Sequence, residues 1–474
     1  MGETQKSSYM KESFQRRTFL KASALLGSAF GLPFVSKAQN TIEAQIARSA
    51  NAPKPVGKSV IGLKNAPIAQ VRVAFIGVGN RGSGHVQLVH ACGAKAKIVA
   101  ICDIQERYTN RSKEWLEAQG VKDVAYYHTK PNAWQEMCRR DDIDLVIIAT
   151  PWEDHVPMCV YAMQQGKHAA TEVPAAYTIE DCWKLVNTAE QTQRNCMMLE
   201  NVCYGDEELW LLNMAQQGVF GTLTYAECGY IHDLRELLFS KTEYYNMWRI
   251  RHNLTRDGNL YPMHGLGPVS QYMNIDRGDR FNHLVSMSSL EASLSEDSGT
   301  ITDPTNEFHN RKGFKHGDMN NTLIKTHLGR TILVQHDVVT ARPYSRINML
   351  AGTKAFHNGY PSKLSMKGKG HGYLKKDEYD ALRAQYQHPI WDKMKAEIEK
   401  NGGHGGMDFV LIYRLIDCLN RGTALDMDVY DAASWSAVTP LSALSIKGGN
   451  APVKFPDFTR GRWQEERKLG ILTV

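Results

Sequence analysis

The sequence predicts an α/β protein of two domains, the first built on a parallel sheet with flanking helices and the second an α+β domain with an open, mostly antiparallel sheet. Three observations lead to this prediction. The chain has 474 residues, which is too long for one ordinary core. Between residues 70 and 205, short buried strands alternate with amphipathic helices, as in βαβ units. After about residue 220 the strands show alternating patterns instead.

Composition and charge are those of an ordinary globular protein, with 42% hydrophobic and 22% charged residues. The formal net charge is +6, but residues 1–40 carry six Lys/Arg against two Asp/Glu. The remaining chain therefore has 50 basic and 48 acidic residues, or a net charge of +2. Such a balance excludes the electrostatic footprint of a protein that binds nucleic acid or an anionic membrane.

The first 40 residues resemble a twin-arginine export signal. An apolar stretch over residues 22–35 and a Ser36-x-Ala38 site follow the run Gln15-Arg16-Arg17-Thr18-Phe19-Leu20-Lys21. The stretch is shorter than the about 20 residues of a membrane span, so we expect no integral membrane segment. The sequence thus predicts an exported protein, periplasmic or secreted, with a linker over residues 41–69.

Five strands are expected in the first domain, over residues 71–76, 97–102, 145–149, 168–171 and 196–199. Helical stretches of about ten to sixteen residues separate most of them, as a parallel sheet requires. The helix after Pro174 begins with something close to a capping box, Thr178 with Asp181 three residues later. We place the boundaries of this domain at residues 70 and 205.

A glycine-rich run directly follows the first strand and leads into a helix: Gly77-Val78-Gly79-Asn80-Arg81-Gly82. Its glycines allow a tight turn, a close approach of the backbone to a pyrophosphate, and packing of the helix on the strand. Asp103 ends the second strand, where a carboxylate can accept hydrogen bonds from ribose hydroxyls and disfavours a 2′-phosphate. The sequence therefore predicts a Rossmann domain that binds NAD rather than NADP.

The second domain, residues 206–474, is expected to contain strands over residues 223–230, 284–288, 322–326 and 331–337, with helices between them. The stretch from 359 to 400 is rich in Lys and Gly and is interpreted as a solvated surface excursion with a helix near 377–387. The nine cysteines are scattered singly, which indicates buried apolar residues. Neither H-E-x-x-H nor a Cys/His spacing occurs, so no metal site is expected.

Several short segments resemble the Gfo/Idh/MocA oxidoreductase family: Ala149-Thr150-Pro151, Trp152-Glu153-Asp154-His155 and Thr171-Glu172-Val173-Pro174. Dehydrogenases of that family usually carry Glu-Lys-Pro at the last place, and the lysine moves protons at the substrate. This chain has Val173 there, and an isopropyl group cannot transfer a proton. An NAD-dependent sugar or inositol dehydrogenase is therefore the alternative interpretation, with Val173 against it.

The whole chain after residue 70 is more similar to glycoside hydrolase family 109, the NAD-dependent α-N-acetylgalactosaminidases. The shared blocks occur in the same order: Gly79-Asn80-Arg81, Trp152-Glu153-Asp154-His155, Glu172-Val173-Pro174, Leu199-Glu200-Asn201, Met247-Trp248-Arg249, Tyr261-Pro262-Met263-His264-Gly265, Arg342-Pro343-Tyr344 and Gly403-His404-Gly405-Gly406-Met407-Asp408. The resemblance implies a glycan or glycoconjugate substrate. It leaves open the anomer, the natural glycan and whether the chain forms a homo-oligomer.

The resemblance also implies which residues meet the two ligands. Besides the glycine run, the residues expected to line NAD are Asn80, Arg81, Asp103, Trp152, Glu153, Asp154, His155, Glu172, Val173 and Asn201. Those expected to meet the sugar are Tyr230, Arg249, Tyr261, Pro262, Met263, His264 and Tyr344. His404, flanked by glycines, is equally compatible with a tight turn before a helix at Asp408.

The implied reaction oxidises the sugar at C3, eliminates the group on C1, adds water and reduces the sugar again. His264 titrates near neutrality and is the first candidate for acid/base work. Tyr230 and Tyr261 are candidate proton carriers if a neighbouring cation or the charge of the nicotinamide ring lowers their pKa, and Glu200 is a candidate base or a partner of the positively charged ring. Arg249 offers a fork of donors to the sugar. The sequence does not decide which residue removes the C2 proton.

Overall fold

The first sheet has six parallel strands in the order β3-β2-β1-β4-β5-β6, which is the order of a Rossmann domain. The computed structural model describes residues 42–473, so the leader predicted over residues 1–40 lies outside the described residues. The strands are β1 (Val71–Ile76), β2 (Ala96–Asp103), β3 (Ala125–His128), β4 (Leu145–Ile148), β5 (His168–Thr171) and β6 (Cys196–Met198). The helices between them are α3 (Asn80–Ala91), α4 (Glu106–Ala118), α5 (Ala133–Cys138), α6 (Trp152–Gln164) and α7 (Ile179–Thr192).

All five strands predicted for this sheet are confirmed within one residue at each end. β3 was not predicted, because its Ala-Tyr-Tyr-His sequence pairs only with β2 and is half-buried throughout. The start of α7 is as expected, since the Thr178 side chain accepts a hydrogen bond from the backbone N–H of Asp181. The carboxyl ends of the strands thus meet at one edge of the sheet, where a dinucleotide is bound in this fold.

The second sheet has eight strands in the order β13-β12-β11-β7-β10-β9-β8-β14. Only β7 and β10 pair in parallel, so the expectation of a mostly antiparallel sheet is confirmed. The strands are β7 (Leu223–Ile231), β8 (Phe281–Ser288), β9 (Asn320–Thr326), β10 (Thr331–Asp337), β11 (Met349–Gly352), β12 (Ala355–Asn358), β13 (Lys363–Met366) and β14 (Val453–Lys454). In β9 buried and exposed residues alternate strictly, so one face of the sheet remains open.

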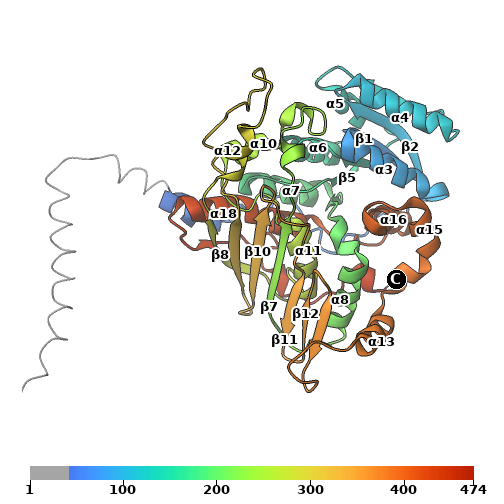
Figure 1. The fold of residues 1–474 in the computed structure, drawn as a ribbon. Coiled ribbons are helices and arrows are strands. Elements are labelled where there is room, and N and C mark those ends of the chain that lie inside the picture. Colours follow the sequence, from blue (N-terminus) through green and yellow to red (C-terminus); the bar gives the residue numbers. More distant parts are fainter. Residues whose placement is uncertain (1–41, 474) are drawn as a thin grey trace, which may run out of the picture.

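Helices pack on the other face and between the two sheets (Figure 1). They are α8 (Asp206–Gln216), α9 (Arg235–Leu238), α10 (Ile250–Thr255), α11 (Met263–Tyr272), α12 (Ser293–Ser298), α13 (Lys376–Tyr386), α14 (Pro389–Lys393), α15 (Lys395–Asn401), α16 (Met407–Arg421), α17 (Val429–Ser436) and α18 (Val438–Lys447). In Figure 1 the first sheet lies at the upper right, in blue to teal, and the second lies below it, in green to orange.

Residues 359–400 lie largely at the surface, as expected, and the helix predicted near 377–387 is α13, but the stretch is anchored on other elements of the domain. This stretch contains β13, which pairs with β12, and α13, which packs against α8. Trp210 of α8 donates a hydrogen bond to the carbonyl oxygen of Leu382, and Arg383 pairs with Asp206. The Lys- and Gly-rich composition indicated the exposure of this stretch, but it could not indicate these contacts, because short elements anchored on distant partners show little periodicity.

The last helices return to the first domain. α16 packs against α3, and α17 packs against α7 and β6. In the segment predicted as a linker, residues 42–49 are helical, the N–H of Val60 donates to the hydroxyl of Tyr430 in α17, and the N–H of Ile68 donates to the carbonyl of Leu419 in α16. All nine cysteines are buried and unpaired, as expected. Within residues 42–473, the helices are either too short or too polar to cross a membrane.

Candidate active site

At two positions of the glycine-rich loop after β1, the backbone accepts no residue other than glycine. Gly77 has a φ of +82°, and a Cβ there would lie 2.7 Å from the carbonyl oxygen of Ala149. A Cβ on Gly82 would lie 1.9 Å from the carbonyl oxygen of Gly77. Gly79, in contrast, would meet only the ring of Tyr108 at 3.8 Å, so its face of the loop is open. The loop thus offers its backbone to a ligand at the start of α3.

Asp103, at the end of β2, is fixed beside this loop. Its carboxylate oxygens accept hydrogen bonds of 2.8 Å from the N–H groups of Val78 and Gln105. Burial raises the pKa of Asp103, and these backbone donors oppose that rise. Each carboxylate oxygen keeps a further lone pair for a hydroxyl donor. The glycine cradle and this acceptor fit the diphosphate and the ribose of NAD, and Asp103 offers no charge complementarity to a 2′-phosphate.

The first residues of α6 support the cofactor edge in different ways. Trp152 is buried in an aromatic group, with ring centroids 5.4 Å from Tyr177 and 4.8 Å from His252. His155 is fully buried, and its ring nitrogens lie 2.8 and 2.9 Å from the carbonyl oxygens of Pro174 and Thr150. Glu153 lies 3.2 Å from His252, whereas Asp154 is exposed. His155 therefore braces the ends of β4 and β5.

Val173 and Asn201 lie at the carboxyl ends of β5 and β6. The side chain of Val173 is buried and apolar, so the chain has no proton-transferring group at the place where dehydrogenases of similar sequence carry lysine. Asn201 is buried and donates a hydrogen bond of 2.6 Å to Asp408, the second residue of α16. These positions link the Rossmann domain directly to the second domain.

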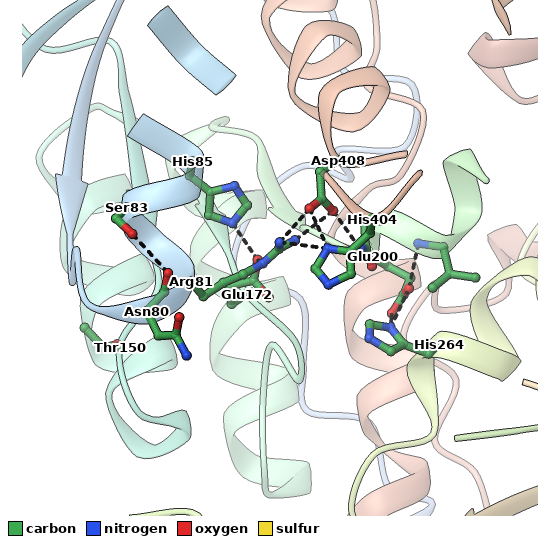
Figure 2. A network of polar contacts seen from close by, with 12 residues as sticks. Asn80, Arg81, Ser83, His85, Thr150, Glu172, Glu200, His264, His404 and Asp408 are labelled. Carbon is green, nitrogen blue, oxygen red and sulfur yellow. Dashed lines mark hydrogen bonds and ion pairs between the residues drawn. The ribbon is translucent and has the colours of Figure 1, made fainter. Parts of the chain in front are cut away.

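Arg81 is the centre of an ionic network shown in Figure 2. Its Nε donates to Glu172 at 2.9 Å, and its two terminal nitrogens donate to Asp408 at 2.7 and 3.0 Å. His85 lies 2.6 Å from Glu172, and His404 lies 2.7 Å from Asp408. Burial opposes ionisation of Glu172, but Arg81 and His85 outweigh it and lower the pKa to about 2. The pKa of Asp408 is also lowered, by His404 and Arg81 against burial.

His264 and Glu200 form a second pair in the same view (Figure 2). The Nδ1 of His264 lies 2.8 and 3.0 Å from the two oxygens of Glu200, whose side chain is 0% exposed and also accepts the N–H of Val202. The His264 side chain is 15% exposed. Because Nδ1 faces a carboxylate, it carries the proton, and Nε2 is left as an acceptor toward the open side.

Two glycines of α11 let His264 reach this position. A Cβ on Gly265 would lie 2.4 Å from the backbone nitrogen of Gly229 in β7, and one on Gly267 would lie 3.0 Å from the Cγ of Glu200. The helix therefore lies in close contact with β7 and with the turn that carries Glu200. The sequence Gly265-Leu266-Gly267 explains why the histidine and the carboxylate meet.

Tyr230, Tyr261 and His264 form one ring cluster, although Tyr261 precedes α11 rather than sharing a helical face with His264. The ring centroids are 4.7 Å apart between the tyrosines, and His264 lies 5.1 Å from Tyr230 and 4.9 Å from Tyr261. The guanidinium of Arg249 lies 4.9 Å from the ring centre of Tyr261 and donates to the hydroxyl of Tyr244 at 2.9 Å. Four of the residues predicted to meet the sugar are thus together.

Burial outweighs the effect of the nearby Arg249 on the pKa of both tyrosines. Burial raises the pKa of Tyr230 to about 12, although Arg249 acts against it. Burial also raises the pKa of Tyr261 well above its usual value. Both phenols are therefore neutral near pH 7 and act as hydrogen-bond donors, which leaves His264 as the acceptor in the cluster.

The other residues predicted to meet the sugar are arranged around this cluster. Tyr344 is 40% exposed, its ring centroid lies 6.4 Å from that of Tyr230, and its hydroxyl accepts from Arg346 at 2.9 Å. Pro262 precedes the first residue of α11, and the side chain of Met263 is fully buried. Met263 therefore supports the cluster from behind, while Tyr344 lies at its open side.

The sequence analysis missed three residues that shape the site. Tyr244 orients Arg249, and His85 and Asp408 fix the network around Arg81. For Asp408 a signal was present, since it ends the glycine-flanked motif that contains His404. Among residues 42–473, no group of three or more His, Cys, Asp or Glu side chains has the arrangement of a metal site.

Comparison with known families places these features in a class. Residues 71–200 match the oxidoreductase family with an NAD-binding Rossmann fold, so the chain carries the NAD-binding domain of that family. Residues 204–465 match the C-terminal domain of glycosyl hydrolase 109.

Curated relatives identify the family over the full length. An α-N-acetylgalactosaminidase of Shewanella oneidensis is 47% identical over 474 residues, which cover 97% of this chain and 99% of the relative. A glycosyl hydrolase family 109 protein of Shewanella baltica is 47% identical over 470 residues, with the same coverage. The chain belongs to glycosyl hydrolase family 109.

Solved structures share the fold at low identity. A levoglucosan dehydrogenase in complex with NADH aligns with a TM-score of 0.60 and 15% identity, covering 82% of this chain and all of that one. An inositol dehydrogenase homologue from Azotobacter vinelandii, complexed with NADH and myo-inositol, aligns with a TM-score of 0.58 and 17% identity, covering 83% and 100%. The fold is thus shared with these dehydrogenases.

Proposed function

We propose that this protein hydrolyses terminal α-N-acetylgalactosaminides from glycans by an oxidation, elimination, hydration and reduction cycle. The observation that carries the proposal is the pairing of His264 with Glu200 beside the edge where the Rossmann domain binds its dinucleotide. The relative from Shewanella oneidensis, named as an α-N-acetylgalactosaminidase, supports the choice of sugar. When bound, NAD supplies a reversible hydride acceptor, so that the sugar is oxidised and reduced again within one turnover.

His264 is the proton acceptor in this proposal. Its Nδ1–H is held by Glu200, which leaves the lone pair of Nε2 available as an acceptor. As Nε2 takes a proton from the sugar, the buried carboxylate of Glu200 stabilises the imidazolium that forms. Glu200 is fully buried and so acts as a positioning residue rather than as a base in contact with the sugar.

Tyr230, Tyr261 and Arg249 supply donors around the same acceptor. The two phenols stay protonated and donate to sugar oxygens, including the oxygen that leaves C1. Arg249 keeps its charge because its neighbours are phenols and aromatic faces, and it donates to an oxygen that becomes negative during elimination. Tyr344 lies on the open side and bounds the sugar there.

The first test is hydrolysis of an aryl α-N-acetylgalactosaminide by the purified protein without added NAD. We expect release of the aryl group, one bound dinucleotide per active chain, and no accumulation of NADH. Formation of NADH in proportion to substrate would identify a net dehydrogenase instead. Activity in a preparation free of pyridine nucleotide would exclude the proposed cycle.

A second test concerns His264 itself. We expect His264→Ala to retain its bound NAD but to lose turnover, because the dinucleotide loop is untouched while the acceptor is removed. Substrate deuterated at C2 shows which proton His264 takes: if it is the C2 proton, exchange with solvent stops in the variant. Unchanged turnover would remove His264 from the mechanism.

We also propose that the protein is exported by the twin-arginine route. The support is the paired Arg16-Arg17 followed by Phe19, Leu20 and Lys21 before an apolar stretch. This route carries folded proteins and suits an enzyme that must acquire its dinucleotide in the cytoplasm. Replacement of Arg16 and Arg17 by lysine should retain the active protein in the cytoplasm, as measured by cell fractionation.

A further inference from the structure

Two residues that are expected to line the dinucleotide share one partner outside the Rossmann domain. Asp408, the second residue of α16, accepts from both terminal nitrogens of Arg81 and from the amide of Asn201. Arg81 follows β1, Asn201 follows β6, and Arg81 also binds Glu172, which follows β5. Asp408 therefore connects the carboxyl ends of β1 and β6 directly, and that of β5 through Arg81.

The network leaves little of Arg81 for a phosphate. Three of its nitrogens donate to Glu172 and Asp408, and one of these also lies 3.4 Å from His404. Figure 2 shows the guanidinium between the two carboxylates, on the side of the sheet edge that faces α16. The side chain of Asp408 is only 3% exposed. A buried carboxylate that binds an arginine through two parallel hydrogen bonds holds its geometry well.

The backbone conformation of the loop before α16 supports the contact between Asp408 and Arg81. Gly403, Gly405 and Gly406 have φ values of +84°, +72° and +103°, and a Cβ on Gly403 would lie 2.9 Å from the Cβ of Asp408. The turn brings His404, whose side chain is 62% exposed, back onto the Asp408 carboxylate. The loop, His404 and Asp408 thus form one rigid end of α16 over the cofactor edge.

We propose that Asp408 is a positioning residue that locks Arg81 and Asn201 in place and thereby keeps NAD bound between turnovers, with His404 holding the Asp408 carboxylate. The inference rests on the proposed function, because a cofactor that is restored in every cycle has no need to leave. Loss of the carboxylate frees Arg81 and Asn201 and unties α16 from the Rossmann domain. The dinucleotide then dissociates faster while the His264 pair stays intact.

The test compares the full-length wild type with Asp408→Asn, which keeps the shape but removes the charge. We expect wild-type protein to retain its NAD through extensive dialysis, and Asp408→Asn to exchange bound NAD for labelled NAD at least about tenfold faster. Turnover of the aryl substrate by Asp408→Asn should fall and then recover when NAD is added. That recovery separates cofactor loss from damage to the chemistry.

Two further variants keep the test decisive. His404→Gln alters an exposed side chain without threatening the fold, and we expect a smaller increase in the NAD exchange rate. Asp144→Asn is the matched control: Asp144 forms a bidentate pair with Arg72 at the amino ends of β1 and β4, far along the strands from the glycine loop. It should leave NAD exchange unchanged.

The proposal is overturned if Asp408→Asn retains NAD as long as the wild type does, or if Asp144→Asn loses it equally fast. A wild type that is active without any nucleotide would refute the proposed function instead. The two failures are therefore distinguishable, because the first is seen in the variants and the second in the wild type alone.

Discussion

At the level of single residues, the proposed chemistry depends on one tautomer of His264. The carboxylate of Glu200 accepts from Nδ1, and its burial prevents water from replacing it. A neutral imidazole carries only one N–H, so the proton on Nδ1 leaves Nε2 basic. This arrangement resembles the acid–histidine pairs of hydrolases, although here we propose that His264 takes its proton from a sugar.

Glu200→Gln should keep the shape of this pair but remove its charge. The Oε1 of Glu200 both accepts the N–H of Val202 and lies 2.8 Å from the Nδ1 of His264, so a glutamine oxygen can accept from both groups. The neutral amide no longer stabilises the imidazolium that forms when Nε2 takes a proton. We expect kcat to fall by about 10²–10⁴, as it does when other histidine-orienting carboxylates are replaced, with the NAD content unchanged.

Glu190→Gln is the control for this change. Glu190 is also a buried glutamate, but it pairs with Arg460 and Tyr430 on the other side of the Rossmann domain. It should leave kcat within about twofold of wild type, because no residue of the site touches it. Equal losses of kcat in both variants would show that removal of any buried glutamate charge lowers the activity. The loss in Glu200→Gln could then not be assigned to its pairing with His264.

At the level of elements, the glycine loop and α3 offer a matched pair of substitutions. Gly82 and Gly84 both lie in the first turns of α3, but a Cβ on Gly82 would overlap the carbonyl of Gly77, and one on Gly84 meets nothing within 4 Å. We expect Gly82→Ala to lose NAD and to unfold more easily, because the backbone of the loop must shift. Gly84→Ala should stabilise the protein by about 0.5–1 kcal/mol, since alanine is the better helix former.

Thermal unfolding and the bound nucleotide content of the two variants provide the measurement. A Gly82→Ala protein that retains NAD would contradict the tight turn as the basis of the cofactor site. A loss of stability in Gly84→Ala would contradict the open environment at that position.

The elements that the sequence predicted are those whose pattern is local. β1 and β5 match their predicted limits, because each is a short buried run next to a clear helix or glycine signal. β11, β12 and β13 have four residues each, too few to show a period, and their stability comes from pairing with β7 and with one another. Such strands are specified by their neighbours rather than by their own residues.

The same limit applies to the candidate site. The motifs identified Arg81, Glu200 and His264 as candidate site residues. The contacts that these residues form cross large distances in the sequence, because Arg81 and Asp408 are 327 residues apart and Glu200 and His264 are 64 residues apart. No local rule connects such pairs. The raised pKa values of Tyr230 and Tyr261 were equally out of reach, because they follow from burial by several elements at once.

At the level of the whole molecule, the two domains are tied together by the chain's own ends. α16 and α17 lie against the Rossmann helices, and Val60 and Ile68, which precede β1, contact them. Arg81 and Asp408, one from each domain, form an ion pair at the cofactor edge. We therefore expect cofactor binding and global unfolding to be linked, because anything that binds only the folded state stabilises it.

Buried histidines make the whole fold sensitive to acid. Burial lowers the pKa of His168, at the start of β5, to about 4, and it also lowers the pKa values of His316 and His336. The Nδ1 of His168 accepts the N–H of Asn195, which requires a neutral ring. A histidine whose folded pKa is depressed takes up its proton in the unfolded state first, so stability falls as the pH drops below about 6.5.

His168→Gln tests this sensitivity in one residue, because glutamine can still accept from Asn195. Between about pH 7.5 and about pH 5, protonation of the unfolded chain at His168 should cost the wild type about 2 kcal/mol, which is 1.36 kcal/mol for each unit between the pH and the unfolded pKa. In urea unfolding at the two pH values, the variant should lose correspondingly less free energy of unfolding than the wild type. An identical loss in both proteins would mean that His168 titrates alike in the folded and unfolded states, and the acid sensitivity in this pH range would then have to come from other buried histidines such as His316 and His336.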